Sequence, residues 1–170
     1  SRTLTIQNSN GGRISGAGIF KLGDATTLTA TPDLGYLFTG WNGDASGNDN
    51  PLEVVMDANR NIGATFTKDV SDPDGDGLSN HDELVLHGTD PDDADSDDDG
   101  CNDFIEVAEE ADPNDAENYP TRVLSIQNSN GGRINGAGIH KLGATVTLTA
   151  IPNEGYLFTR WTDDAAGNAN

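Results

Sequence analysis

The chain has little sulfur and little positive charge. Cys101 is its only cysteine, so no internal disulfide can hold the fold. Its thiol could form an intermolecular bridge, but a thiol without a chemical role is favoured. Nine Lys and Arg residues face 29 Asp and Glu residues, giving a net charge of −20. Such a charge argues against nucleic acid and anionic membranes as partners. No apolar run could cross a bilayer and no signal-peptide pattern is present, so we expect no membrane insertion of this segment.

The sequence also lacks a recurring catalytic constellation. The three histidines, His81, His87 and His140, do not form a repeated group, and the Ser and Thr residues lie in strand-like runs without a histidine at a recurring position. Carboxylates are abundant, but the metal loops described below account for most of them. We therefore expect a protein that is not an enzyme, with no catalytic residues and no organic cofactor.

What the sequence does contain is an acidic block between residues 69 and 117. This block holds 20 of the 29 acidic residues and no Lys or Arg. Unneutralised, such a segment repels itself and stays expanded, so one interpretation is a disordered acidic linker. A disordered linker has no need of a fixed spacing of residue types, and this block has one.

Two strings in the block share the ligand spacing of an EF-hand calcium loop. DPDGDGLSNHDE starts at Asp72 and DSDDDGCNDFIE starts at Asp95. Each has Asp at positions 1, 3 and 5, Gly at 6, Asn or Asp at 9 and Glu at 12. Position 7 supplies only its carbonyl, so Leu and Cys can both occupy it. The predicted ligands are Asp72, Asp74, Asp76, Leu78, Asn80 and Glu83 in the first loop, and Asp95, Asp97, Asp99, Cys101, Asp103 and Glu106 in the second.

The flanks of these loops differ from those of a regulatory EF-hand pair. No amphipathic helix precedes Asp72, and the exit segments 80–87 and 102–110 are short, with Gly88 a candidate helix cap. The string D-x-D-x-D-G-L-S-N-x-D-E followed by G-T-D-P resembles the thrombospondin type-3-like calcium repeats of bacterial secreted proteins. That resemblance implies that further acidic residues help to bind additional ions. The matching positions are Asp90, Asp92, Asp93 and Asp112.

An internal repeat frames the acidic block. Residues 1–50 and 121–170 align without a gap, and 34 of the 50 positions are identical. The sequence therefore predicts a first module at 1–68, a tandem calcium-binding connector at 69–120 and a truncated second module at 121–170. The second copy lacks a counterpart of residues 51–66. Those strands lie outside this segment, or a neighbouring subunit supplies them by strand addition.

The repeated module has the pattern of a small, mainly β domain. Apolar and polar residues alternate in short runs separated by glycine-rich turns, which predicts strands near 3–8, 26–32, 36–42, 51–57 and 61–68. The string G-Y-x-F-x-x-W, followed by G-D-A-S-G-N and A-T-F, resembles the divergent internalin-B-type (Listeria–Bacteroides-like) repeat modules. That family is common in bacterial surface and secreted proteins, and a β-grasp-like or sandwich fold would suit it.

Three aromatic residues recur in both copies. Tyr36, Phe38 and Trp41 reappear as Tyr156, Phe158 and Trp161. A small domain needs large residues to fill its core, so a core role is favoured over a stacking platform for sugars.

Together these patterns predict a calcium-binding structural repeat segment of a bacterial extracellular or surface protein, such as a stalk, filament or adhesin shaft. At least two Ca²⁺ ions would stiffen the connector. Copies of the same chain or neighbouring repeats would be its partners. The alternative is an accessory region of a secreted enzyme that binds carbohydrate or a host-cell ligand.

Overall fold

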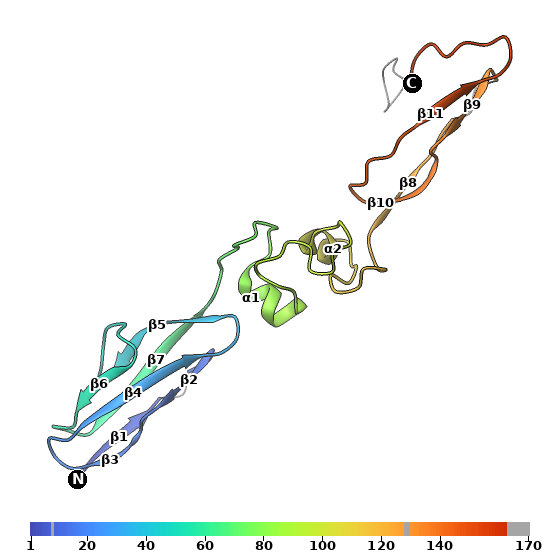
Figure 1. Cartoon of the computed structure of the whole chain (residues 1–170). Coiled ribbons are helices and arrows are strands. Elements are labelled where there is room, and N and C mark those ends of the chain that lie inside the picture. The colour runs from blue at the N-terminus through green and yellow to red at the C-terminus, as the bar shows by residue number, and fades with distance from the viewer. Residues whose placement is uncertain (8, 128–129, 163–170) are drawn as a thin grey trace. The chain divides into compact units, whose positions relative to one another are not determined.

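The computed structural model describes residues 1–7, 9–127 and 130–162. The fold is mainly β, with several small sheets and a few short helices, which confirms the predicted class (Figure 1). The chain divides into two compact units, residues 1–94 and 95–170, and the division falls inside the acidic block. The first loop therefore belongs to the unit of the first module, and the second loop belongs to the unit of the second.

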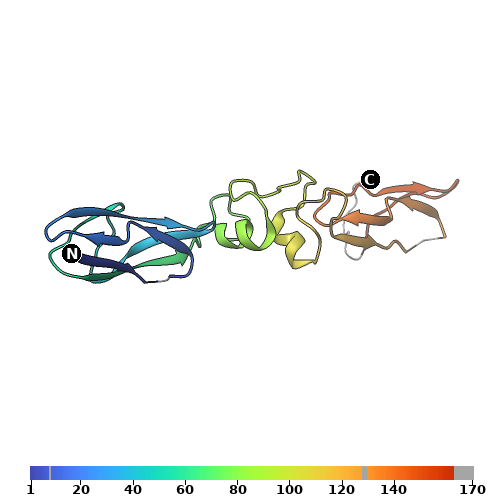
Figure 2. The same cartoon turned by 90° about the horizontal axis from the view of Figure 1, so that it is seen from below.

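The first module consists of two sheets (Figure 1; Figure 2). Every strand pair is antiparallel except the pair formed by the first and last strands of the module. The four-stranded sheet has the order β3 (Gly18–Phe20), β1 (Arg2–Ile6), β7 (Arg60–Lys68) and β5 (Tyr36–Gly43), and the three-stranded sheet has the order β2 (Gly12–Ser15), β4 (Ala25–Pro32) and β6 (Leu52–Val55).

One hydrophobic core joins the two sheets. Alternate side chains point inward, as expected for strands with one solvated face. Leu4 and Ile62 from the larger sheet meet Leu28 from the smaller one, and all three are at most 2% exposed. Burying each such aliphatic side chain contributes about 1.5–3 kcal/mol, so this shared core holds the module together.

The structure confirms the five predicted strands and adds two. The additional strands, β2 and β3, flank Gly16, which has a φ of 112°. The glycine-rich sequence of this stretch predicts turns. Its strands are only four and three residues long, and their side chains are partly buried rather than core-forming. Too few alternating residues are present for a periodic signal.

A short helical segment begins at position 9 of the first loop. It comprises α1 (Asn80–Asp82) and the π-helical turn η1 (Glu83–His87). Ser79 caps its beginning by accepting a hydrogen bond from the Asp82 backbone N–H, and Gly88 ends it at a φ of 75°. The predicted exit helix and its glycine cap are thus confirmed.

The second unit repeats this plan. Helix α2 (Asp103–Ala108) begins at position 9 of the second loop and is capped by the Asn102 side chain, which accepts from the Ile105 backbone N–H. The strands form two pairs whose registers are the same as in the first module, shifted by 120 residues: Gly138 pairs with Leu124 as Gly18 pairs with Leu4. These pairs are β10 (Gly138–Lys141) with β8 (Thr121–Leu124), and β11 (Thr149–Pro152) with β9 (Gly132–Asn135).

Candidate metal centres

The first loop brings its three leading aspartates together. Asp72, Asp74 and Asp76 each offer a carboxylate oxygen, and these oxygens all lie within 4.8 Å of one another. Backbone N–H groups fix the carboxylates: Gly75 donates to Asp72 Oδ1 at 2.8 Å and Leu78 donates to Asp76 Oδ1 at 2.6 Å. The loop backbone thus wraps around a cluster of oxygens.

The second loop has the same construction. Oxygens of Asp95, Asp97 and Asp99 also lie within 4.8 Å of one another. Gly100 N–H donates to Asp95 Oδ2 at 2.7 Å, and Cys101 N–H donates to Asp99 Oδ1 at 2.7 Å. Among the described residues, these two triplets are the groups of acidic side chains that could hold an ion.

Glycine at loop position 6 has a conformational role. Gly77 has a φ of 112° and Gly100 a φ of 89°, which are values that residues with a Cβ rarely adopt. The turn expected at this position is therefore present in both loops.

Buried oxygens without a donor give each loop the chemistry of a cation site. In the first loop these oxygens are Asp74 Oδ2 and Asn80 Oδ1. The Asn80 amide is oriented by its Nδ2 group, which donates to Asp69 Oδ2 at 3.0 Å and leaves the oxygen as an acceptor. In the second loop they are Asp97 Oδ2 and both oxygens of Glu106. A buried acceptor without a donor costs about 1–3 kcal/mol, and more when it is charged. A calcium ion, which takes oxygen ligands, fits both loops.

The electrostatics agree with this assignment. Burial raises the pKa values of Asp74 and Asp97, and the neighbouring loop aspartates add to the increase. Burial and then the charges of Asp99, Asp97 and other loop aspartates raise the pKa of Glu106 to about 7. These carboxylates repel one another, and a divalent cation among them would remove that repulsion.

The position-12 glutamates lie outside the two aspartate triplets. Glu83 and Glu106 are fully buried, on η1 and α2 respectively. The Thr89 hydroxyl donates to Glu83 Oε1 at 3.4 Å. At position 9, Asp103 is also fully buried, and its two oxygens accept from the Ser96 backbone N–H and hydroxyl at 2.9 and 2.7 Å. Asp103 therefore helps to fold the second loop.

The additional aspartates predicted as ligands are exposed and lie in local turns. Asp90 Oδ1 accepts from the Asp92 N–H at 3.1 Å, and Asp112 Oδ1 accepts from the Asn114 N–H at 3.1 Å. In the described part of the chain, neither these residues nor Asp93 belong to a group of acids close enough to share an ion.

Sequence reasoning missed the residues that attach the first loop to its module. The His81 side chain is 3% exposed, and its Nδ1 lies 3.1 Å from the carbonyl oxygen of Gly35. That contact requires a proton on Nδ1. The same carbonyl accepts from the Asp69 N–H at 2.9 Å, and the His81 N–H donates to the Asp69 carbonyl at 3.0 Å. No local pattern marks a contact between residues 46 positions apart.

A lysine attaches the second loop to its module. Lys141 Nζ lies 2.8 Å from Asp99 Oδ2 and 3.9 Å from the centroid of the Tyr119 ring. Nearby, Arg122 pairs with Glu109 at 2.7 Å. The sequence signal available for this contact was the repetition of the lysine, as Lys21 in the first module and Lys141 in the second. The repeat did not indicate which residue Lys141 contacts.

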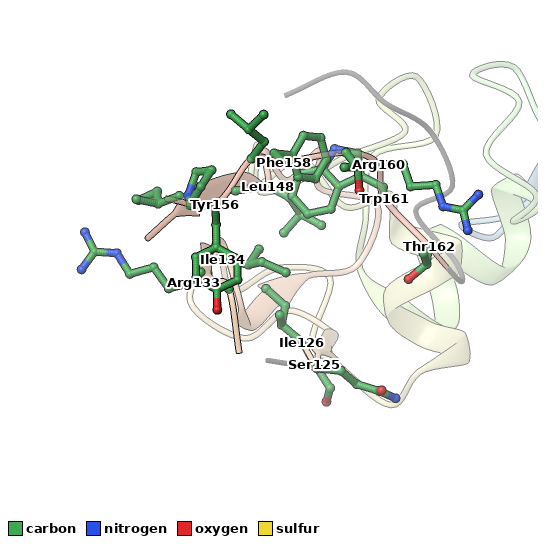
Figure 3. A pocket seen from close by; sticks show the side chains of 18 of the residues that line it. Ser125, Ile126, Arg133, Ile134, Leu148, Tyr156, Phe158, Arg160, Trp161 and Thr162 are labelled. Carbon is green, nitrogen blue, oxygen red and sulfur yellow. The ribbon is translucent and has the colours of Figure 1, made fainter. Parts of the chain in front are cut away.

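The recurring aromatics have a core role in the first module. Trp41 is 5% exposed, its Nε1 donates to the Asp49 carbonyl at 2.7 Å, and the centroid of its ring lies 5.2 Å from that of Phe38. In the second module their counterparts line a groove of about 580 Å³, with Phe158 and Trp161 on one side and Ile134 on the other (Figure 3). In the first module the corresponding side chains pack in the core with Val54 of β6 and Ile62 of β7.

Comparison with known families identifies the modules. A family model described as the divergent InlB B-repeat domain matches residues 2–70 and 122–170, and leaves the two loops outside the match. No curated protein and no solved structure matches the chain. None of the helices in the described residues is long and apolar enough to cross a membrane. Repeats of this family are typical of bacterial surface proteins. Because the matched residues make up more than half of the sequence, the chain belongs to the divergent InlB B-repeat family.

Proposed function

We propose that the chain is a non-enzymatic, calcium-binding structural segment of a bacterial surface or secreted protein, with one Ca²⁺ ion in each loop. The observation that carries the proposal is the set of buried oxygens without donors around the two aspartate triplets. The resemblance of the loops to thrombospondin type-3-like calcium repeats supports the same assignment.

Each ion would be held by oxygens alone. The aspartates at positions 1, 3 and 5 supply the first ligands, and the carbonyl at position 7 adds a neutral one. The buried glutamate at position 12 closes the site when the loop tightens around the ion. The residues concerned are Asp72, Asp74, Asp76, Leu78, Asn80 and Glu83 in one loop, and Asp95, Asp97, Asp99, Cys101 and Glu106 in the other, where Asp103 folds the loop.

Calcium would act on the connector as a folding ligand. Without the ion, the block of 20 acidic residues is self-repelling. With it, each loop is stabilised by about RT ln(1 + [L]/Kd), where [L] is the free calcium concentration. Extracellular modules of this loop type bind with Kd values of about 10⁻⁴–10⁻³ M, so they fill outside a cell.

The ordering of each loop by its ion would be transmitted directly to the β module that the loop contacts. The first loop is attached through His81 and Gly35, and the second through Lys141 and Asp99. A connector whose loops are ordered by ions, each fixed to a β module, suits a stalk, filament or adhesin shaft built from repeats. Copies of the chain or neighbouring repeats are the partners that this role requires.

Metal analysis and limited proteolysis with and without EDTA test the proposal. We expect one bound Ca²⁺ per loop, and cleavage between Asp90 and Asp95 that becomes at least several-fold faster when the ion is removed. A Glu83→Gln/Glu106→Gln variant should be cleaved at the same rate with and without calcium, whereas Glu53→Gln, an exposed change on β6, should behave like the wild type. Equal cleavage of the wild type with and without EDTA, or a chain that retains no calcium, would contradict the proposal.

A further inference from the structure

The second loop already contains a cation from the protein itself. The Lys141 ammonium forms an ion pair with Asp99 Oδ2 and also donates a hydrogen bond to the Asp99 carbonyl oxygen. The Asp99 side chain is 1% exposed and that of Lys141 is 21% exposed, so water screens this pair weakly. The ring of Tyr119 lies against the ammonium and adds a cation–π contact.

The oxygen that Lys141 holds is the one that a calcium ion needs. Asp99 occupies loop position 5, and its Oδ1 accepts the hydrogen bond from Cys101 N–H that shapes the loop. Oδ2 is therefore the oxygen left for a ligand role, and it faces Lys141 at 2.8 Å. An ammonium group and a calcium ion cannot both occupy the same side of one carboxylate oxygen without strong repulsion.

The source of this cation is the β module that follows the loop. Between residues 69 and 117 the sequence has no Lys or Arg, whereas Lys141 is the last residue of β10. The neutralising charge therefore comes from the second module rather than from the loop. Because Lys141 lies at the end of β10, the calcium occupancy of the second loop depends on the contact between that loop and the second module.

We propose that Lys141 competes with Ca²⁺ for Asp99 Oδ2, so that the second module regulates calcium binding at the second loop. This inference rests on the proposed function of the loops. Binding is reciprocal: if the Lys141 contact weakens calcium binding, calcium weakens the Lys141 contact by the same factor. The second loop then exchanges an internal ion pair for a bound metal ion and loosens β10 as it fills.

A lysine-to-methionine exchange tests the competition directly. Lys141→Met keeps the apolar stem and removes the charge. Calcium titration of the full chain, followed by NMR at the Gly77 and Gly100 amides, reports the two loops separately. We expect the calcium affinity of the second loop, reported by the Gly100 amide, to increase about fivefold or more, which is the lower end of typical coupling between two sites. The affinity of the first loop, reported by the Gly77 amide, should stay unchanged.

The repeat provides a matched control. Lys21 occupies the equivalent position in the first module and is exposed, so Lys21→Met makes the same change in net charge without touching the second loop. Lys141→Arg keeps the charge and should retain a calcium affinity close to that of the wild type. If Lys141→Met binds calcium at Gly100 no more tightly than Lys21→Met, the competition is refuted.

Lysine acylation gives a second readout that does not depend on substitution. In the wild-type chain, calcium should raise the acylation rate of Lys141 relative to that of Lys21, because the ammonium is released from Asp99. An unchanged or lower relative rate in calcium-saturated protein would overturn the inference. A chain that binds no calcium at either loop would refute the proposed function itself, so the two failures are distinguishable.

Discussion

The ring of His81 meets the ring of Tyr36 edge to face, with the two centroids 4.9 Å apart and an interplanar angle of 82°. His81 is the second residue of α1, at the end of the first loop, and Tyr36 begins β5 of the first module. The pair therefore joins the first acidic loop to the β module, beside the contact between His81 Nδ1 and the Gly35 carbonyl. Aromatic pairs of this geometry contribute about 0.5–1.5 kcal/mol beyond their buried area.

Replacing His81 should detach the first loop from its module. His81→Ala removes the edge-to-face contact and the hydrogen bond to Gly35, so we expect a loss of about 1–3 kcal/mol. Hydrogen exchange at the amides of η1 should rise accordingly.

In a double-mutant cycle, Tyr36→Leu and His81→Ala should show a coupling energy of about 0.5–1.5 kcal/mol. Tyr156→Leu is the matched control, because Tyr156 is 57% exposed, and should change stability by less than about 0.5 kcal/mol. Additive effects of the two substitutions would show that the ring contact contributes nothing.

Gly35 allows a sharper test of the same interface. A Cβ at Gly35 would lie 2.9 Å from Val85 Cγ2 and 3.1 Å from His81 Cα, whereas a Cβ at Gly155 would meet nothing within 4 Å. Both glycines have positive φ values, 70° and 82°, so alanine incurs a similar backbone cost of about 1–2 kcal/mol at either position.

Gly35→Ala should therefore destabilise the protein more than Gly155→Ala does. The difference, about 1–3 kcal/mol, measures how tightly the helical segment packs on the turn before β5. Chemical denaturation of the two variants, with protease sensitivity of residues 80–88 as a local measure, provides the comparison. Equal losses for the two variants would mean that this packing does not persist in solution.

The two acidic loops were predictable because their pattern is local in the sequence. Alternate aspartates at fixed spacing, with glycine at position 6, define a loop within twelve residues, and the structure gathers the aspartates of both loops. The five predicted strands were predictable for the same reason, because alternation of apolar and polar residues identifies a half-buried strand. β2 and β3 were missed because each begins with a glycine and lies close to Gly11 or Gly16, so the sequence pattern there is that of turns.

The attachments between loops and modules were not predictable from the sequence. Gly35 and His81 are 46 positions apart, and Asp99 and Lys141 are 42 positions apart. Neither contact follows a fixed spacing in the sequence, because the number of residues between the two partners depends on how the modules fold. The sequence marked Lys141 and Tyr156 only as repeated residues, and gave no indication that one contacts a loop while the other is exposed.

Cys101 should resist alkylation in the folded protein. Its side chain is 3% exposed, and burial, together with the charges of Glu106 and Asp99, raises the pKa of the thiol. A raised pKa lowers the thiolate fraction at pH 8, and the thiolate is the reactive form. Iodoacetamide should therefore label Cys101 at least tenfold more slowly in the native chain than in denaturant. Because only its carbonyl is a predicted ligand, Cys101→Ala should bind calcium as the wild type does. Rapid labelling of calcium-loaded protein would show that the second loop opens.

Glu106→Gln should have opposite effects on stability with and without calcium. Both oxygens of Glu106 are buried without a hydrogen-bond donor, and the surrounding aspartates raise its pKa to about 7. Above that pH, in chelator, the substitution removes a buried and repelled charge, so the melting temperature of the second unit should rise. In millimolar calcium the same substitution removes the ligand that closes the loop, so the stabilisation by calcium should fall by about 1.4 kcal/mol or more, equal to a tenfold loss in affinity.

Glu110→Gln, an exposed change four residues later, is the control and should change neither the stability in chelator nor the stabilisation by calcium. Thermal melts of both variants in EDTA and in calcium test whether the effect of the substitution changes sign. A Glu106→Gln chain that is less stable than the wild type in both conditions would show that Glu106 contributes to packing and not to ion binding.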